Sequence, residues 1–163
     1  MIQILYYIYL VKKDYKLKRR QKHYFLKKMD QLEFHIERLR AAGLRPTKQR
    51  LAICKSLFSK KETFHFTIEK LKKIVEKDSR KKISLATLYN TVHSLKNRGY
   101  LKEISIKGNK TFFDTNTKHH HHFYDERMSQ LVDIEDKNIL VGNLPKAPNG
   151  KKIKSVEVLV KIV

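Results

Sequence analysis

The sequence contains a single cysteine, Cys54, among 163 residues. One cysteine cannot form an internal disulfide, and it excludes a structural metal site built from several cysteines. The chain also lacks any run of 18 or more apolar residues, so we expect no helix that crosses a membrane. These absences favour a protein of a reducing, cytoplasmic compartment, and the length suffices for one good core or two small ones.

Acidic residues are few, 16 against 37 Lys and Arg, which gives a formal net charge of +21. Such a balance is typical of proteins that bind a polyanion, because Lys and Arg neutralise backbone phosphates. Lys greatly outnumbers Arg, however, as the codon bias of an AT-rich genome would produce. Charge alone therefore leaves both nucleic-acid binding and compositional drift open.

Residues 1–28 differ from the rest of the chain. They begin with the apolar run MIQILYYIYLV, which is too short to cross a bilayer and lacks the positive start of a secretory signal. A strongly basic tract without a clear helical or strand period follows. We interpret residues 1–28 as a basic leader outside the native protein, with translation beginning at Met29. A basic DNA-contacting arm and a weak anchor at a membrane surface are the alternatives.

Three amphipathic helices are expected in the first half of the chain. The first begins with the capping pair Asp30 and Glu33, and the next two begin after Thr47 and Thr67, whose hydroxyls can cap a helix. Each helix carries apolar residues at helical spacing. Cys54 falls on the apolar face of the second helix, so we interpret it as a core residue rather than a redox or metal-binding thiol.

A fourth helix, between Ser84 and Gly99, has the pattern of a DNA-reading helix. Its apolar stripe consists of Leu85, Leu88, Val92 and Leu95. The opposite face is small and polar, whereas a merely solvated face of this chain should carry more Lys. Asn can bond base edges in the major groove, and the methyl groups of Ala and Thr can contact thymine. The residues expected to contact DNA from this helix are Ser84, Ala86, Thr87, Tyr89 and Asn90.

Two alternating segments, 101–106 and 110–114, flank a short turn and predict a β-hairpin with a basic tip. Helices followed by such a hairpin describe a winged helix-turn-helix. Lys107 and Lys110, at the tip of the wing, would contact the DNA backbone.

The second half contains the run His119–His122, which lies inside the chain and is followed by aromatic and acidic residues. Alternate residues of an extended segment share a face, so His119 and His121 would point away from His120 and His122. Imidazole binds Zn, Fe, Mn and haem iron. An adventitious surface tract is the alternative.

Two strands, 129–134 and 152–163, and a short helix over 136–144 are expected after the His run. These elements form too small a core to stand alone and leave an open sheet edge. Pairing with a second copy would cover both, and a two-fold dimer would match a palindromic operator. The predicted fold class is α+β, with an N-terminal winged helix-turn-helix over 29–114 and a small α/β dimerisation domain over 115–163.

Four strings together resemble the ferric uptake regulator (Fur) family: LRAAGLRPTKQR (39–50), HFTIEKL (65–71), SLATLYNTVHSLKNRGYLKEI (84–104) and TFFDTNTKHHHHFYDE (111–126). Within the family, the chain is most similar to the iron response regulators, because FDTN precedes the His run and aromatic residues follow it. The resemblance implies a homodimeric winged-helix transcription factor that binds double-stranded operator DNA, usually to repress. Tyr89 matches the family's recognition-helix tyrosine, and Arg45 matches a basic residue that reaches the minor groove.

The resemblance also implies metal ligands. Four residues match an inter-domain regulatory site: His65, Asp114, His121 and Asp133. A further family histidine falls on Phe123, which cannot ligate. A second site, for haem or a second metal, would use His120 and His122 with His119 beside them, although its later partners have no counterparts here. The implied cofactors are a divalent metal (Fe²⁺, Mn²⁺ or Zn²⁺) and haem.

We therefore predict an iron- or haem-responsive repressor, in which ligation at the His cluster controls DNA affinity. A regulator that ignores metal and keeps a vestigial His tract is the alternative. The sequence has no HExxH motif and no carboxylate dyad poised as a general base, so an enzyme is not expected. A metal-storage protein would leave the helix between Ser84 and Gly99 unexplained.

Overall fold

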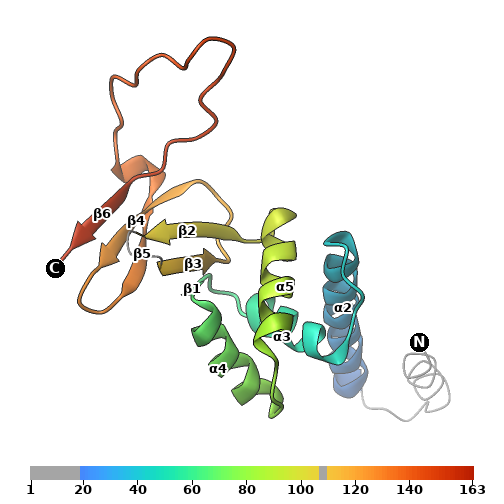
Figure 1. The fold of residues 1–163 in the computed structure, drawn as a ribbon. Helices are drawn as coiled ribbons and strands as arrows, with labels where there is room; N and C mark the ends of the chain where they lie inside the picture. Colours follow the sequence, from blue (N-terminus) through green and yellow to red (C-terminus); the bar gives the residue numbers. More distant parts are fainter. Residues whose placement is uncertain (1–18, 107–109) are drawn as a thin grey trace.

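The computed structural model describes residues 19–106 and 110–163 (Figure 1). Within these ranges the chain forms four α-helices and two three-stranded sheets. The helices are α2 (Arg19–Ala41), α3 (Lys48–Phe58), α4 (Ile68–Ser79) and α5 (Leu85–Asn97). Lys107 of the expected wing tip and the first 18 residues of the expected leader lie outside the described residues. None of the described helices is both long and apolar enough to cross a membrane.

Helices α3, α4 and α5 begin where the capping residues predict. Thr47, Thr67 and Ser84 each accept a hydrogen bond from the backbone N–H three residues later, at 3.3, 3.3 and 3.1 Å. These bonds satisfy N–H groups that have no partner inside the helix. Beyond the end of α5, Gly99 has a φ of +80°, a conformation that favours glycine after a helix.

The predicted start of the first helix at Asp30 and Glu33 is wrong. α2 is continuous from Arg19 to Ala41, so both acidic residues lie inside the helix with their side chains exposed. Inside a helix, each backbone N–H is already bonded to the carbonyl four residues back and offers nothing to a capping carboxylate. The boundary proposed at residue 28 therefore falls within a helix, and the division at that point remains a prediction.

The first sheet has the strand order β1-β3-β2, with β1 (His65–Phe66), β2 (Lys102–Ile106) and β3 (Lys110–Asp114) all antiparallel. β2 and β3 are the two strands of the predicted wing. β1 is the short segment before α4, and it pairs with the last residues of β3, so that His65 lies opposite Asp114. This pairing joins the wing to the helical part of the fold (Figure 1).

The second sheet has the order β5-β4-β6, with β4 (His120–Asp125), β5 (Gln130–Glu135) and β6 (Leu159–Ile162). β4 pairs antiparallel with β5 and parallel with β6. The strand expected over 129–134 is confirmed by β5. Two other predictions were wrong in extent, because the strand expected over 152–163 is limited to β6 and the helix expected over 136–144 is a single 3₁₀ turn, Asp136–Asn138.

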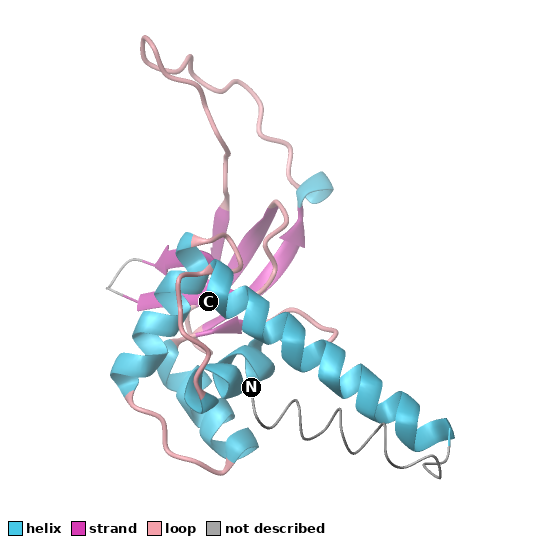
Figure 2. Ribbon diagram, turned by 90° about the vertical axis from the view of Figure 1, so that its right-hand side faces the viewer, coloured by secondary structure: helices cyan, strands magenta, loops and turns pink. Residues whose placement is uncertain are grey.

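Residues 139–158 form a long loop that extends away from the sheets (Figure 2). Leu140, which should face a core if this segment were a helix, is 97% exposed. Asn143 has a φ of +54°, and Pro145 and Pro148 lack the N–H that a helix or a strand ladder needs. These interruptions explain why the apolar periodicity of this segment produces little regular structure.

Two groups of buried apolar side chains position the sheets. The larger group packs the four helices against β1 and β3, and it includes Cys54, which is fully buried. Burial raises the pKa of the Cys54 thiol to about 12, as expected for a core residue without redox chemistry. The smaller group packs the wing against the second sheet and consists of Ile104, Ile106, Phe112, Tyr124 and Leu131. The wing therefore contacts both the helices and the second sheet.

Candidate metal centre and DNA-facing helix

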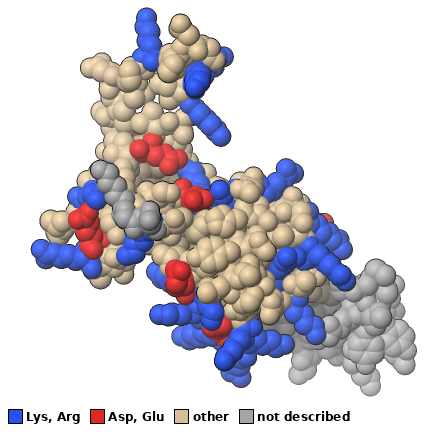
Figure 3. All heavy atoms as spheres, in the orientation of Figure 1, with Lys and Arg blue, Asp and Glu red and all other residues tan. Residues whose placement is uncertain are grey.

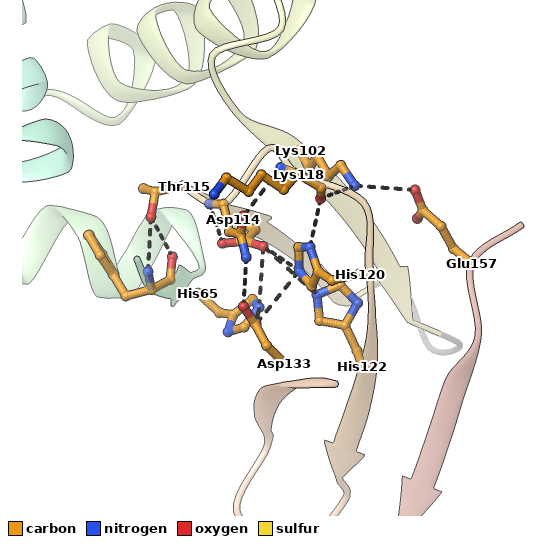
Figure 4. Close-up of polar contacts among 11 residues, drawn as sticks. His65, Lys102, Asp114, Thr115, Lys118, His120, His122, Asp133 and Glu157 are labelled. Atoms are coloured by element: carbon orange, nitrogen blue, oxygen red, sulfur yellow. Dashed lines mark hydrogen bonds and ion pairs between the residues drawn. The ribbon is translucent and has the colours of Figure 1, made fainter. Parts of the chain in front are cut away.

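Five side chains that can bind a metal ion converge where the two sheets meet (Figure 4). They come from four strands and are His65, Asp114, His120, His122 and Asp133. Each offers one ligand atom, and these atoms all lie within 4.8 Å of one another. Two of the residues belong to the sheet of the wing and three to the second sheet, so the cluster spans both.

The strand registers explain the convergence. His65 lies directly opposite Asp114 in the first sheet, and His122 lies opposite Asp133 in the second. His120 is two residues before His122, and alternate residues of a strand point to the same face. Two cross-strand pairs and one extra histidine therefore form the cluster.

The contacts within the cluster have the geometry of ligands around a shared ion. His65 Nε2 lies 2.9 Å from Asp133 Oδ1, and His120 Nε2 lies 3.0 Å from Asp114 Oδ2. Neighbouring ligand atoms bound to one ion at about 2.1 Å are separated by about 3.0 Å in octahedral and about 3.4 Å in tetrahedral coordination. Two buried atoms, His65 Nε2 and Asp114 Oδ2, form no hydrogen bond of good geometry within the described residues. Buried donor atoms that lie close together without hydrogen-bond alignment suit a shared cation, so the donor set fits a metal.

The surroundings prepare these groups to act as ligands. The Nδ1 of His120 lies 2.8 Å from the carbonyl oxygen of Lys118, and a proton on Nδ1 leaves the lone pair of Nε2 for the cluster. Although burial of Asp114 opposes its ionisation, the nearby imidazoles of His122 and His65 and the backbone N–H of Asn116 hold the pKa of its carboxyl well below the usual range. Asp114 is therefore an ionised ligand at neutral pH.

A second group contains His119, His121 and Asp136. Asp136 Oδ1 lies 2.8 Å from His119 Nδ1 and 3.3 Å from His121 Nε2. The remaining ring nitrogens contact the backbone that leads into β6: His121 Nδ1 accepts from Val158 N at 3.2 Å, and His119 Nε2 lies 3.1 Å from the Val156 carbonyl oxygen. In this group both nitrogens of each ring are engaged, so its present contacts attach the C-terminal segment.

The structure changes the grouping expected for the regulatory site. It brings His65, Asp114 and Asp133 together as predicted, but His121 lies on the opposite face of β4 with His119. The imidazoles that complete the cluster are His120 and His122, which the sequence assigned to a separate site. The shift is one residue along β4, which in a strand moves a side chain to the other face of the sheet. Asp136, in the second group, was not among the predicted site residues.

α5 presents the predicted polar face to solvent. Leu88, Val92 and Leu95 are fully buried, whereas Leu85, expected in the same stripe, is 48% exposed at the first position of the helix. On the other side, Ala86, Tyr89 and Asn90 are exposed. Among the described residues, none of the candidate metal cluster lies on this face, and its side chains are exposed.

The remaining DNA-contact candidates lie at the start of α5, before α3 and on the wing. The hydroxyl of Ser84 donates to Thr87 Oγ1 at 2.8 Å, so both side chains take part in capping α5. Arg45 and Lys110 are exposed. On the face drawn in Figure 3, Lys and Arg side chains border the helical part and also stand at the tip of the C-terminal loop. Positive charge of this kind suits contacts to a phosphate backbone.

A row of rings leads from α5 towards the metal cluster. The ring of Tyr89 stacks on that of His93, with centroids 6.1 Å apart, and His93 meets the edge of Phe113 at 5.5 Å. Phe113 stacks in turn on Phe66 at 5.7 Å. Phe113 directly precedes the cluster residue Asp114, so the exposed face of α5 and the cluster are joined through packed side chains.

Helices that expose a polar recognition face, a β-hairpin wing and a second sheet define an α+β winged-helix regulator with a dimerisation domain. The chain belongs to the ferric uptake regulator family, whose family model matches residues 41–161. This is a family of metal-responsive transcription regulators rather than enzymes.

Relatives and solved structures agree with this assignment. The peroxide-responsive repressor PerR of Staphylococcus aureus is 35% identical over 105 residues, which cover 64% of this chain and 69% of PerR. The ferric uptake regulator of Pseudomonas aeruginosa, solved with manganese, has the same fold with a TM-score of 0.58 at 19% identity, covering 78% of this chain and 96% of that one. The Helicobacter pylori regulator Fur, described with three functional metal-binding sites, also gives 0.58, at 18% identity over 80% of this chain and 89% of its own.

Proposed function

We propose that this chain is a cytoplasmic, metal-dependent transcriptional repressor that binds operator DNA as a homodimer. The observation that carries the proposal is the convergence of three imidazoles and two carboxylates from both sheets on one point. A cation held there would connect the winged-helix part, 29–114, to the dimerisation part, 115–163. These bounds are those predicted from the sequence.

The exposed face of α5 would meet DNA in the major groove. Tyr89 and Asn90 would contact base edges, with Ala86 beside them, because their side chains are exposed and small or planar. Ser84 and Thr87 would act at the capped end of the helix, where backbone N–H groups favour a phosphate. Arg45 would enter the minor groove, and Lys107 and Lys110 of the wing would contact the backbone.

Metal binding would act on DNA affinity by selecting one orientation of the two parts. His65 and Asp114 lie on strands that pack against the helices, whereas His120, His122 and Asp133 lie on the second sheet. A bound cation supplies a positive centre that holds both carboxylates and all three imidazoles. A ligand that binds one arrangement better shifts the population towards it.

The donor set favours Fe²⁺, Mn²⁺ or Zn²⁺, since imidazole and carboxylate suit these ions and no thiolate is present in the cluster. Iron as the sensed metal is the hypothesis from the resemblance to the iron response regulators. Response to peroxide is a second candidate, favoured by the 35% identity to the repressor PerR. Haem at His120 and His122 is less well supported, because the two residues are only 4% and 3% exposed and their Nε2 atoms lie 2.9 Å apart.

The test is the affinity of the full chain for DNA, measured by fluorescence anisotropy on a duplex selected from a random pool. We expect the metal-free protein to bind weakly, and Fe²⁺, Mn²⁺ or Zn²⁺ to raise affinity by about 5- to 150-fold, the usual range of coupling between sites. His122→Ala should abolish the increase, whereas Thr117→Ala, an exposed neighbour outside the cluster, should retain it.

Other results would point to other functions. Equal affinity with and without metal would establish the metal-independent alternative and overturn the proposal. Loss of DNA binding by the Fe²⁺ form on addition of hydrogen peroxide would favour the peroxide response. Release of the DNA when haem alone is added, with no effect of metal ions on DNA affinity, would favour the haem hypothesis. Sedimentation of the same samples would show whether the DNA-binding species is a dimer.

A further inference from the structure

We infer that Asn116 is a positioning residue of the metal centre, and that it orients ligands from both sheets. Asn116 lies in the segment between β3 and β4, which connects the two sheets. The inference rests on the proposed function, because it concerns the residues proposed to hold the ion. It adds a residue that offers no ligand atom to the cluster itself.

Asn116 contacts both carboxylates of the cluster. Its backbone N–H donates to Asp114 Oδ1 at 2.7 Å, and its side-chain Nδ2 donates to Asp133 Oδ2 at 2.9 Å. Each carboxylate thus has one oxygen engaged by Asn116. The other oxygens, Asp114 Oδ2 and Asp133 Oδ1, are the ones that approach the imidazoles of His120 and His65. Asn116 therefore determines which oxygen of each carboxylate faces the ion.

The same side chain also acts on a histidine ligand. Asn116 Oδ1 accepts a hydrogen bond from Lys118 N at 3.2 Å. The carbonyl oxygen of Lys118 lies 2.8 Å from His120 Nδ1 (Figure 4). A fixed carbonyl at this place holds the His120 ring in position and keeps its proton on Nδ1. Asn116 thus influences Asp114, Asp133 and His120, which are three of the five ligands.

Only a primary amide fits these contacts at this length. The side chain must donate at one end, to Asp133, and accept at the other, from Lys118, and it must add no charge beside two carboxylates. Aspartate would lose the donor and place a third negative group against Asp133. Alanine would lose both side-chain contacts but keep the backbone bond to Asp114. Glutamine would keep the amide and displace it by one methylene.

The experiment compares Asn116→Ala with wild type and with the control Thr117→Ala, all in the full chain. Mn²⁺ affinity is measured by competition with a chelator, and the thermal midpoint of each metal-free protein is measured separately. Loss of a residue that orients ligands costs about 10- to 100-fold in metal affinity. We expect that loss in Asn116→Ala, with wild-type affinity in Thr117→Ala and a metal-free midpoint similar in both.

Two further measurements separate positioning from a general structural role. Asn116→Ala should weaken Mn²⁺ binding less in a protein that already carries Asp133→Ala than in wild type, because the contact to Asp133 is then gone and only the contact to Lys118 remains to be lost. Cobalt-substituted Asn116→Ala should also show a visible spectrum different from wild type, since the coordination of Asp133 has changed. If the alanine variant lowers the metal-free midpoint, Asn116→Gln replaces it, with the same loss of affinity expected.

The outcomes distinguish the inference from the proposed function. Wild-type protein that binds neither Mn²⁺ nor Co²⁺ overturns the proposed metal centre, and the inference with it. Wild-type protein that binds metal while both Asn116 variants bind equally well overturns the inference alone. Additive losses in Asn116→Ala and Asp133→Ala would also contradict it.

Discussion

His35 is a buried polar residue of α2 that lies apart from the metal centre. It is only 5% exposed, with Nε2 3.2 Å from Ser59 Oγ, and its Nδ1 has no hydrogen-bond partner among the described residues. Burial, and then the positive charges of Arg38 and Lys55, lower the pKa of its imidazole. The charged form of His35 is therefore less favourable in the folded protein than in the unfolded chain.

This shift predicts that acid destabilises the fold. Because the pKa of His35 is lower in the folded state, its contribution to stability is complete above pH 6.5 and is lost as the pH falls from there through the folded-state pKa. Between pH 7.5 and 5.5, His35→Leu should lose less stability than wild type. A single group accounts for at most about 1.4 kcal/mol per pH unit. Urea unfolding of metal-free protein at both pH values measures the difference, and equal losses would contradict the assignment.

At the same scale, the sequence predicted most residues of the candidate metal cluster but not how they are grouped. His65, Asp114 and Asp133 were predicted from the resemblance to the family, and the structure brings them together. Alternation along the His run correctly placed its members on two faces. Which face of β4 contributes its histidines to the cluster depends on the register between β4 and β5, in which His122 pairs with Asp133. That register depends on contacts between the two strands, and the alternation of residues along β4 alone does not predict it.

Among the elements, α5 is the one that connects the proposed DNA-binding face with the candidate metal centre. The rings of Tyr89, His93 and Phe113 are in contact, and Phe113 is followed by Asp114 on β3. Asp114 and Phe113 are adjacent on one strand, so a movement of Asp114 towards an ion would also change how Phe113 packs against His93. His93 is the side chain through which that movement would reach Tyr89.

Removing the His93 ring should therefore weaken the effect of metal binding on DNA affinity, while the metal cluster and the exposed face of α5 both remain. In His93→Ala we expect Mn²⁺ affinity to stay near the wild-type value, while the metal-induced gain in DNA affinity falls by about 2- to 30-fold, as for residues between coupled sites. Titrations of labelled DNA with and without Mn²⁺ give the gain. Ser94→Ala, the next residue on α5, is the matched control. A gain unchanged in His93→Ala would show that the row of rings carries no coupling.

The elements also differ in how far the sequence predicted them. Helices α3, α4 and α5 depend on local caps and apolar spacing, and their starts were predicted correctly from Thr47, Thr67 and Ser84. The start of α2 at Arg19 was not predicted, since a helix can continue through residues without strong apolar periodicity. The loop over 139–158 was not predicted either: the alternation from residue 152 onwards indicated a strand, whereas the chain pairs with β4 only over Leu159–Ile162.

At the scale of the whole molecule, an ion at the cluster would join two sheets that otherwise meet through the small core between wing and β4. Ligands that bind only the folded protein stabilise it by mass action. We expect Mn²⁺ at 100 times its dissociation constant to add about 2.7 kcal/mol to the free energy of unfolding. Calorimetry with Mn²⁺ and with chelator measures the change. His122→Ala should show no such gain, and an equal gain there would mean that the ion binds elsewhere.

The connection between β3 and β4 has a further consequence for the metal centre. Asp114 and His120 are six positions apart, so the chain between them cannot exceed about 20 Å even when fully extended. Groups tethered this closely meet at an effective concentration of millimolar order or above, whatever the ion does. A departing cation would thus leave Asp114 and His120 within reach of each other, and these two residues could capture the next ion without a search by distant parts of the chain. The time that the regulator needs to respond would then be set by ion release and not by refolding.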